Sequence, residues 1–312
     1  MTAEASTREA YGRTLIELGK QNKDIIVLDA DLSLSTMTYL FAQEFPEHFF
    51  DCGLEEQNMI GIAAGLAASG KIVFASSFAV FASCRCFDQV RLCVSQPKLN
   101  VKIVATHSGI SVGEDGTSHH AIEGLSLYCA LPSFTVIVPA DAIETTKAVK
   151  AAAATYGPFY IRLSRLKTPL IYHEDHHFMV GKSVTLRRGK DVTIIAMGIM
   201  VAKALQAAQK LATQGIDSRV IDMHTLNPLD EKAIIKAASE TGAIVVAEEH
   251  LAHGGLGSRV AQIVAKEKPV PMAFVNLEDH YASSGKGEEL LRRFGLTAEG
   301  IEKAAKQVVR KQ

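Results

Sequence analysis

Short apolar runs alternate with helix-like segments along almost the whole chain of 312 residues. Apolar runs of this length are typical of strands in a parallel sheet that is covered on both faces. In the first half they lie at residues 25–30, 71–78, 101–108, 134–140 and 159–164. Helical patterns lie between them, at residues 8–20, 54–69, 87–94 and 141–155. This alternation predicts an α/β fold with a parallel sheet.

The alternation pauses at a polar stretch that carries several histidines, TPLIYHEDHHFMVGKS at residues 168–183. It then restarts and continues to the C-terminus with four further strand and helix pairs. Domains commonly contain about 100 to 200 residues, so the length suits two of them. We predict a first α/β domain at residues 1–170, a linker at 171–187 and a second α/β domain at 188–312.

Composition excludes several classes of partner. The net charge is −1, so no strong field attracts nucleic acid or an anionic membrane. The apolar segment 61–83 is divided by Lys71 into a helical and a strand-like part, which argues against a transmembrane helix. The N-terminus lacks the apolar core of a signal peptide. The cysteines are an odd set without a CxxC pair, as expected for reduced thiols in a cytoplasmic protein: Cys52, Cys84, Cys86, Cys93 and Cys129.

Two adjacent glutamates, Glu55 and Glu56, begin the apolar, small-residue helical pattern that follows Gly53. A carboxylate buried without a partner costs several kcal/mol, so this position needs an explanation. Periodicity does not choose between the two residues, because the segment that follows is apolar on nearly every side. Capping of the helix by both glutamates is the structural alternative to a functional carboxylate.

Polar side chains gather after the predicted strands, where a parallel sheet binds its ligands. The loop after the first strand holds Asp29, Asp31, Ser33 and Ser35, and the loop after the last predicted strand of the first half holds Arg162 and Arg165. The loop at residues 106–120 is the richest, with His107, Glu114, Asp115, His119 and His120 beside three glycines. Its spacing does not match a metal site, and a solvated loop is the alternative interpretation. Four side chains are of the types that grip a phosphate monoester: Arg8, Ser35, His107 and Arg165.

The common phosphate-binding and nucleophile motifs are missing from the sequence. It contains no GxGxxG, no GxxxxGK[ST] and no GxSxG. In the second half, HGGLGS at residues 253–258 is more typical of a tight strand-to-helix turn than of an anion-binding site. His224 is more typical of a turn residue than of a catalyst. If the chain uses a phosphorylated cofactor, something else must hold the phosphate.

Four stretches together resemble transketolases in order and spacing, from the start of the pyrimidine-binding domain of that family onward. They are GLEEQNMIGIAAGLAASG, SSFAVFASCRCFDQVRL, ATHSGISVGEDGTSHH and YIRLSR. The resemblance covers the chain essentially end to end. It implies a pyrimidine-binding domain followed by a transketolase C-terminal domain, as in the C-terminal subunit of a split transketolase.

The resemblance also implies a cofactor, a partner and a reaction. Members of the family use thiamine diphosphate to move a two-carbon ketol unit from a ketose phosphate to an aldose phosphate. Their diphosphate and Mg²⁺ are held by an N-terminal domain with a GDG…N motif, which this sequence lacks. The expected partner is therefore an N-terminal subunit that carries this motif, with two copies of each subunit and the cofactor at their interface.

Matching motifs imply roles for residues at the cofactor. Glu56 matches the glutamate that hydrogen-bonds the ring nitrogen of the aminopyrimidine and favours its imino tautomer. Phe78 and Phe81 match the aromatic pocket around the pyrimidine, with Phe81 as the stacking partner. Asp31 matches an aspartate near the thiazolium side. Plain core packing is the structural alternative for the two phenylalanines.

The same motif matches imply roles for residues at the substrate. His107 and His119 match positions poised for hydroxyl and carbonyl groups, and Asp115 matches a contact to a sugar hydroxyl or is only a turn residue. The substrate phosphate is matched by a clamp made of Arg8, Ser35 and Arg165. A clamp of this kind would select phosphorylated sugars over free ones.

Three departures from the family pattern lie beside these positions. Cys84 stands where many members have a third aromatic residue, the common THDS reads THSG, and His120 replaces a glutamine. Three other functions share part of the pattern: the beta subunit of a 2-oxo acid dehydrogenase, a deoxyxylulose-phosphate-synthase-like enzyme, and a structural subunit that has lost activity. The histidine-flanked GEDG loop favours the transketolase interpretation over the first of these.

Overall fold

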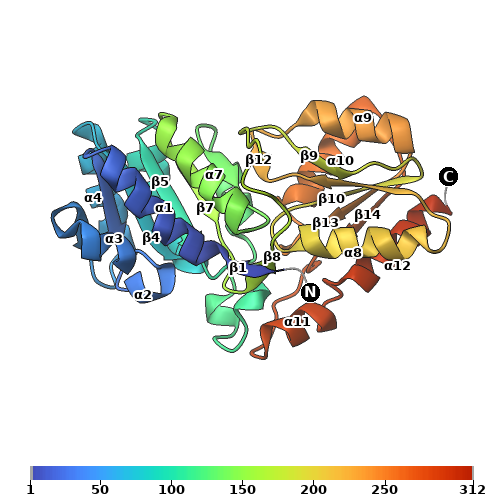
Figure 1. Ribbon diagram of the computed structural model, residues 1–312, viewed down its shortest axis with the longest axis horizontal. Helices are drawn as coiled ribbons and strands as arrows, with labels where there is room; N and C mark the ends of the chain where they lie inside the picture. The colour runs from blue at the N-terminus through green and yellow to red at the C-terminus, as the bar shows by residue number, and fades with distance from the viewer. Residues whose placement is uncertain (1–2, 311–312) are drawn as a thin grey trace.

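Two sheets lie side by side in the molecule, and helices cover both faces of each (Figure 1). The computed structural model describes residues 3–310. The first sheet has seven strands in the order β12-β6-β7-β5-β4-β2-β3, and the second has five in the order β14-β13-β10-β11-β9. The predicted α/β class with two mostly parallel sheets is confirmed.

All five strands predicted in the first half are present and pair in parallel within the first sheet. They are β2 (Ile25–Asp29), β4 (Ile72–Phe78), β5 (Val101–Thr106), β6 (Thr135–Ile137) and β7 (Phe159–Arg162). Two short edge strands were not predicted: β3 (Phe49–Asp51) and β12 (Thr225–Asn227). β12 comes from the second half of the sequence and pairs antiparallel with β6. Three residues are too few to show a period, which explains why the sequence did not reveal these strands.

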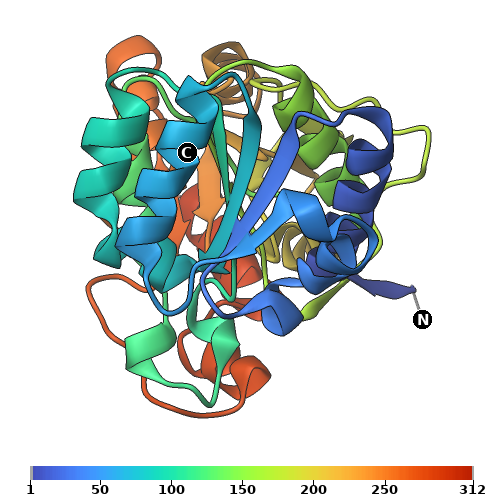
Figure 2. The ribbon, with the colours of Figure 1, turned by 90° about the vertical axis from the view of Figure 1, so that its left-hand side faces the viewer.

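Alternate residues of the first sheet point to opposite faces and build two separate cores. Helices α1 (Thr7–Gln21) and α7 (Ala142–Ala154) pack on the face that includes Val27 and Phe74. Helix α4 (Glu56–Ala68) packs on the other face, where Met59 and Ile60 meet Leu28 and Val73. Figure 2 looks onto this domain and shows α4 on one side of the sheet and α1 with α7 on the other.

The helix predicted at residues 87–94 has a different form. A π-helical turn at Phe81–Arg85 leads into the short helix α5 (Phe87–Gln89), and a second π-helical segment follows at Val90–Ser95. A π-helical turn accommodates an extra residue within a helix and is frequent at functional sites. Three further short helices complete the domain: α2 (Ser33–Thr36), α3 (Tyr39–Glu44) and α6 (Gly124–Cys129).

The second sheet has four parallel strands and one antiparallel edge strand. The parallel strands are β10 (Val192–Ala196), β11 (Ser218–Asp222), β13 (Ile244–Ala247) and β14 (Met272–Val275). The edge strand β9 (Val184–Arg187) falls within the predicted linker 171–187. Helices α8 (Met200–Ala212) and α12 (Ala298–Val309) cover one face, and α9 (Glu231–Thr241) and α10 (Leu256–Glu267) cover the other (Figure 1).

Two small contacts position the start of α1 and the loop after β5. Strand β1 (Glu4–Ser6) pairs antiparallel with β8 (Lys167–Pro169), with Ser6 opposite Lys167, so Arg8 and Arg165 are brought together. Helix α11 (Gly287–Arg293), which was not predicted, lies against the turn at Ile110–Val112 in the loop after β5. Within residues 3–310, no helix is both long and apolar enough to span a membrane.

Candidate functional site

The carboxylate of Glu56 is buried at the first residue of α4, where Glu56 is only 1% exposed. Both of its oxygens accept a hydrogen bond from Nη1 of Arg85, at 3.0 and 2.9 Å. Glu55 occupies the N-cap position and is exposed, but its side chain makes no capping hydrogen bond. Capping therefore does not explain the pair. Adjacent helical residues point about 100° apart, so only one of the two carboxylates faces inward.

Four rings gather beside the end of β4. The rings of Phe78 and Phe81 are 6.1 Å apart and inclined by 16°. The ring of His107 stacks on Phe78 at 3.9 Å, and that of His119 meets Phe81 edge-on at 5.2 Å. The register of the sheet explains the cluster, because Phe78 on β4 lies opposite Thr106 on β5 and His107 comes next.

Arg85 links the buried carboxylate to this ring cluster. Its guanidinium carbon lies 4.3 Å from the centre of the Phe81 ring, in addition to its ion pair with Glu56. The side chain of Arg85 is 49% exposed, whereas that of Glu56 is fully covered. Arg85 was not predicted as a site residue, because one arginine four residues after Phe81 in a helical pattern is usually a surface residue.

His107 is held as a neutral ring in an unusual backbone conformation. Its φ of 54° lies in the left-handed region, which a residue other than glycine rarely adopts. Burial, followed by the positive charges of Arg8 and Arg165, lowers the pKa of His107 to about 3. Nδ1 lies 2.9 Å from the hydroxyl of Thr106. A neutral imidazole at this position can hydrogen-bond a hydroxyl or carbonyl group without adding a charge.

The predicted phosphate-binding residues also lie together. Nη1 of Arg8 donates to the main-chain oxygen of Ser35 at 2.5 Å, and Nη2 reaches the main-chain oxygen of Arg165 at 3.5 Å. Nη1 of Arg165 donates to Val112 O at 2.5 Å and pairs with Asp115 at 3.4 Å. Burial and the charge of Arg165 lower the pKa of Arg8. Two neighbouring guanidinium groups of this kind favour the binding of an anion.

Asp31 stands apart from the ring cluster in its contacts. It is exposed, has a φ of 59°, and its N–H donates to the carboxylate of Asp51. The neighbouring Asp29, which received no role from the sequence, is buried and accepts hydrogen bonds from the Thr36 and Thr38 hydroxyls. Burial raises the pKa of Asp29 to about 6. Asp29 therefore shapes the loop that carries Ser35.

The second domain supports the loop at residues 107–120. The carboxylate of Glu249, just after β13, accepts the N–H of Ser111 at 2.7 Å. It lies so close to Gly109 that a Cβ there would collide with it, and Gly109 also has a φ of 73°. Further along the loop, the hydroxyl of Thr117 donates to Ala282 O at 2.6 Å. Figure 2 shows this loop beside the α11 region at the bottom of the view.

Two of the three departures from the family pattern, His120 and Cys84, are placed differently. His120 is buried, and its Nε2 lies 3.2 Å from Gly113 O, so the ring braces the loop from within. Cys84 is exposed, and its Sγ lies 3.7 Å from Oε1 of Glu123. His120 thus supports the loop, whereas Cys84 leaves a small, accessible side chain beside the ring cluster.

Comparison with known families agrees with this geometry. The family model for the transketolase pyrimidine-binding domain matches residues 3–170, and that for the transketolase C-terminal domain matches residues 181–301. This chain belongs to the transketolase family. The resemblance inferred from its sequence motifs is confirmed, and the chain corresponds to the C-terminal section of a transketolase.

Similar proteins include chains of the same extent. A 6-deoxy-6-sulfo-D-fructose transketolase subunit of Clostridium sp. (strain MSTE9) is 42% identical over 98% of this chain and 95% of its own length. An apulose-4-phosphate transketolase subunit of Phocaeicola vulgatus is 39% identical over 97% of each chain. A solved structure described as a split gene transketolase, an inactive β4 tetramer, is 49% identical with a TM-score of 0.92 and covers 98% of both chains.

A pyrimidine-binding domain of the transketolase family implies thiamine diphosphate, and the residues present fit its pyrimidine. Such a ring is flat and needs an aromatic face together with a partner for its ring nitrogen. Phe81 provides the face and Glu56 the buried carboxylate. The planar guanidinium of Arg85 already contacts both, so a flat group fits between the carboxylate and the ring in this part of the transketolase chain.

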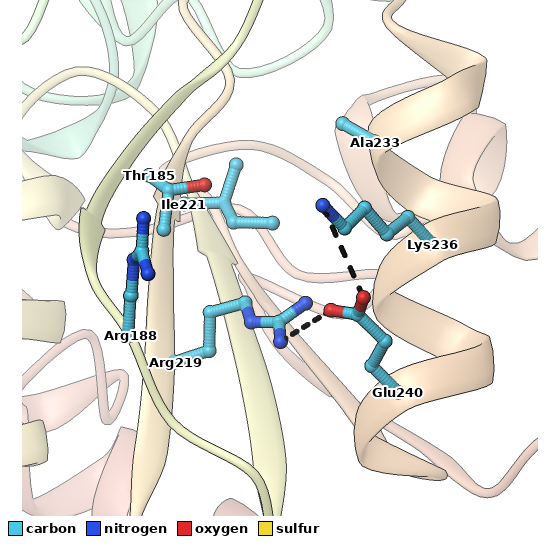
Figure 3. A pocket seen from close by; sticks show the side chains of 7 residues that line it. All are labelled: Thr185, Arg188, Arg219, Ile221, Ala233, Lys236 and Glu240. Carbon is cyan, nitrogen blue, oxygen red and sulfur yellow. Dashed lines mark ion pairs between the residues drawn. The ribbon is translucent and has the colours of Figure 1, made fainter.

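A separate hollow of about 350 Å³ lies in the second domain between β9, β11 and α9. Figure 3 shows Glu240 between Arg219, at 2.6 Å, and Lys236, at 3.9 Å. The remaining lining residues are Thr185, Arg188, Ile221 and Ala233. None of the residues expected to act in a transketolase site lines this hollow. This hollow is therefore separate from the candidate site of this chain.

Proposed function

We propose that this chain is the catalytic C-terminal subunit of a thiamine-diphosphate-dependent transketolase. It acts on a ketose phosphate and an aldose phosphate, moving a two-carbon ketol unit from the first to the second. The observation that carries this proposal is the buried carboxylate of Glu56 beside the Phe78 and Phe81 rings, next to two histidines and two arginines. A structural subunit without activity would have no need to keep this set together.

Glu56 and Phe81 would hold the aminopyrimidine of the cofactor, with Phe78 behind them. Glu56 would share the proton of its carboxyl group with the ring nitrogen, in a site where burial excludes water. The bound cofactor supplies a nucleophilic carbon that the side chains of this chain do not provide. Asp31, at the end of β2, is proposed to face the thiazolium side of the same group.

His107 and His119 are proposed to contact hydroxyl and carbonyl groups of the sugar. His107 is suited to this because its ring is neutral and is fixed against Phe78. Asp115 is proposed to bind the sugar hydroxyl beside the bond that forms. Its pairing with Arg165 would join sugar recognition to phosphate recognition.

Arg8, Ser35 and Arg165 are proposed to bind the phosphate of the substrate. Their support is that the Arg8 guanidinium reaches the main chain of Arg165 and that the charge of Arg165, after burial, lowers the pKa of Arg8. Relatives of similar length are named for a sulfo-sugar and for apulose 4-phosphate. Both names specify a sugar that carries an anionic group. We propose that phosphorylated sugars are the substrates of this chain.

The partner is proposed to be an N-terminal subunit with a GDG…N motif that holds the diphosphate and Mg²⁺. Two relatives are themselves named as subunits, and the split-gene structure of a tetramer of one subunit is described as inactive. We propose two copies of each subunit in the active enzyme, since the cofactor would lie between them.

Reconstitution tests the proposal directly. The purified chain is assayed for ketol transfer with thiamine diphosphate and Mg²⁺, alone and mixed with a GDG-bearing N-terminal subunit. Transfer is expected only in the mixture, and faster with phosphorylated than with unphosphorylated sugars. Full turnover by the isolated chain would refute the split enzyme, and a mixture active on 2-oxo acids alone would refute the transketolase activity.

A further inference from the structure

We propose that Arg85 is a placeholder for the cofactor's pyrimidine, and that its guanidinium must withdraw from Glu56 and Phe81 before the pyrimidine binds. This inference rests on the function proposed above, which assigns both of those residues to the pyrimidine. It gives a role to a residue that the sequence motifs did not single out.

The two contacts of Arg85 coincide with the two contacts that a pyrimidine would need. Nη1 bonds both oxygens of Glu56, at 3.0 and 2.9 Å, and the guanidinium carbon lies 4.3 Å from the Phe81 ring centre. A guanidinium is planar, carries N–H donors and stacks on aromatic faces. It therefore offers the carboxylate and the ring the same kinds of interaction as a flat nitrogen heterocycle whose ring nitrogen carries a proton. Both groups cannot occupy this position together.

The difference in exposure shows which partner of the pair would move. Glu56 is fixed by the first turn of α4 and is 1% exposed, so its carboxylate cannot turn to solvent. The Arg85 side chain is 49% exposed and ends a π-helical turn, so it can swing outward with little loss of packing. A buried carboxylate without a partner is strongly destabilising. The positive charge of Arg85 thus compensates the negative charge of Glu56 until the pyrimidine takes its place.

A permanent counter-ion is the competing role for Arg85. In that role the arginine would stay on the carboxylate while the cofactor binds, and its removal would weaken cofactor binding. As a placeholder it competes with the cofactor, and its removal strengthens binding. The two roles therefore predict opposite changes in the dissociation constant.

The test compares Arg85→Ala and Arg85→Lys with Arg91→Ala. Arg91 is a suitable control because it lies on the next helical segment and pairs with the exposed Asp88. Thiamine diphosphate is titrated calorimetrically, at saturating Mg²⁺, into the complex reconstituted with the N-terminal subunit. We expect Arg85→Ala to lower the dissociation constant by roughly tenfold, because the competing state is removed. The dissociation constant of Arg85→Lys should fall between those of Arg85→Ala and the wild type, and that of Arg91→Ala should match the wild type.

Thermal unfolding of the isolated chain provides a second measurement that needs no cofactor. Arg85→Ala should lower Tm by several degrees because Glu56 loses its partner, and adding Glu56→Gln to that variant should restore most of the loss. Unchanged or weaker cofactor binding by Arg85→Ala would overturn the placeholder. Failure of the wild-type complex to bind thiamine diphosphate would instead refute the proposed function itself.

Discussion

The two domains contribute to the candidate site in different ways. The first domain supplies the side chains proposed to contact cofactor and substrate. They come from the first turns of α1 and α4, from the end of β4 and the π-helical turn after it, and from the segments that follow β2, β5 and β7. The second domain supplies none of them, but it holds the loop at residues 107–120 through Glu249 and Ala282. A domain without recognisable motifs can thus be needed for a site whose chemistry lies entirely in its neighbour.

Each domain also contains a pair of adjacent glutamates, and the pairs divide their tasks differently. In the first domain only Glu56 is buried, while Glu55 is exposed. In the second domain Glu248 and Glu249 are both buried, at 1% and 3% exposure. Glu248 binds the first N–H groups of α10, at Leu256 and Gly257, whereas Glu249 reaches across to Ser111. These pairs provide matched variants for separating chemistry, support and stability.

The largest effect is expected at Glu56. Glu56→Gln should lower kcat of the reconstituted enzyme by at least about 100-fold, because the pyrimidine would lose the carboxyl group that shares a proton with its ring nitrogen. Glu55→Gln should leave kcat nearly unchanged, since that carboxylate is exposed and makes no capping bond. Steady-state kinetics and circular dichroism of both variants check this. Equal activities in the two variants would remove Glu56 from the site.

A smaller effect is expected at the support in the second domain. Glu249→Gln should reduce kcat by roughly tenfold and destabilise the fold by about 3 kcal/mol, because buried Arg162 loses the carboxylate it faces at 4.0 Å. Glu248→Gln should destabilise the fold to a similar degree but leave kcat of the folded enzyme close to the wild-type value. Urea unfolding and kinetics separate the two. If both variants lose activity equally, the loss in Glu249→Gln does not come from its contact with the loop at residues 107–120.

The smallest effect concerns the contact between the domains. Glu144 on α7 is fully buried, and burial raises its pKa from 4.5 to about 8. Burial, followed by the charge of Glu144, raises the pKa of Asp222 on β11, whose Oδ2 accepts the Tyr172 hydroxyl at 2.7 Å. Both raised pKa values mean that the folded chain holds protons which the unfolded chain releases.

The stability that Glu144 contributes should therefore be fully present below pH 4.5 and should be lost as the pH rises towards 8. We expect the free energy of unfolding to fall by roughly 1–3 kcal/mol between pH 5 and pH 8. Glu144→Gln should flatten this dependence, whereas Glu17→Gln, at an exposed residue paired with Lys150, should not. Urea unfolding at several pH values measures it, and a rise in stability over that range would contradict the assignment.

Much of the fold could be predicted from the sequence because its signals are local. Continuous apolar runs marked the parallel strands, and amphipathic periods marked α1, α7 and α8. The short strands β3 and β12 and helix α11 were missed because they are too short to show a period. The ring cluster was anticipated from motifs, and the structure brings Phe78, Phe81, His107 and His119 into contact. Their catalytic roles remain predictions.

By itself the sequence determined the α/β class, the order of most elements, and which loops carry polar side chains, because these depend on neighbours along the chain. Only the tertiary structure decided that Glu56 and not Glu55 is buried, that Arg85 covers both Glu56 and Phe81, and that Glu249 holds Ser111. The physical reason is that burial and long-range pairing depend on how separate elements pack. Ser111 and Glu249 are 138 residues apart in the chain, so no local pattern could have joined them.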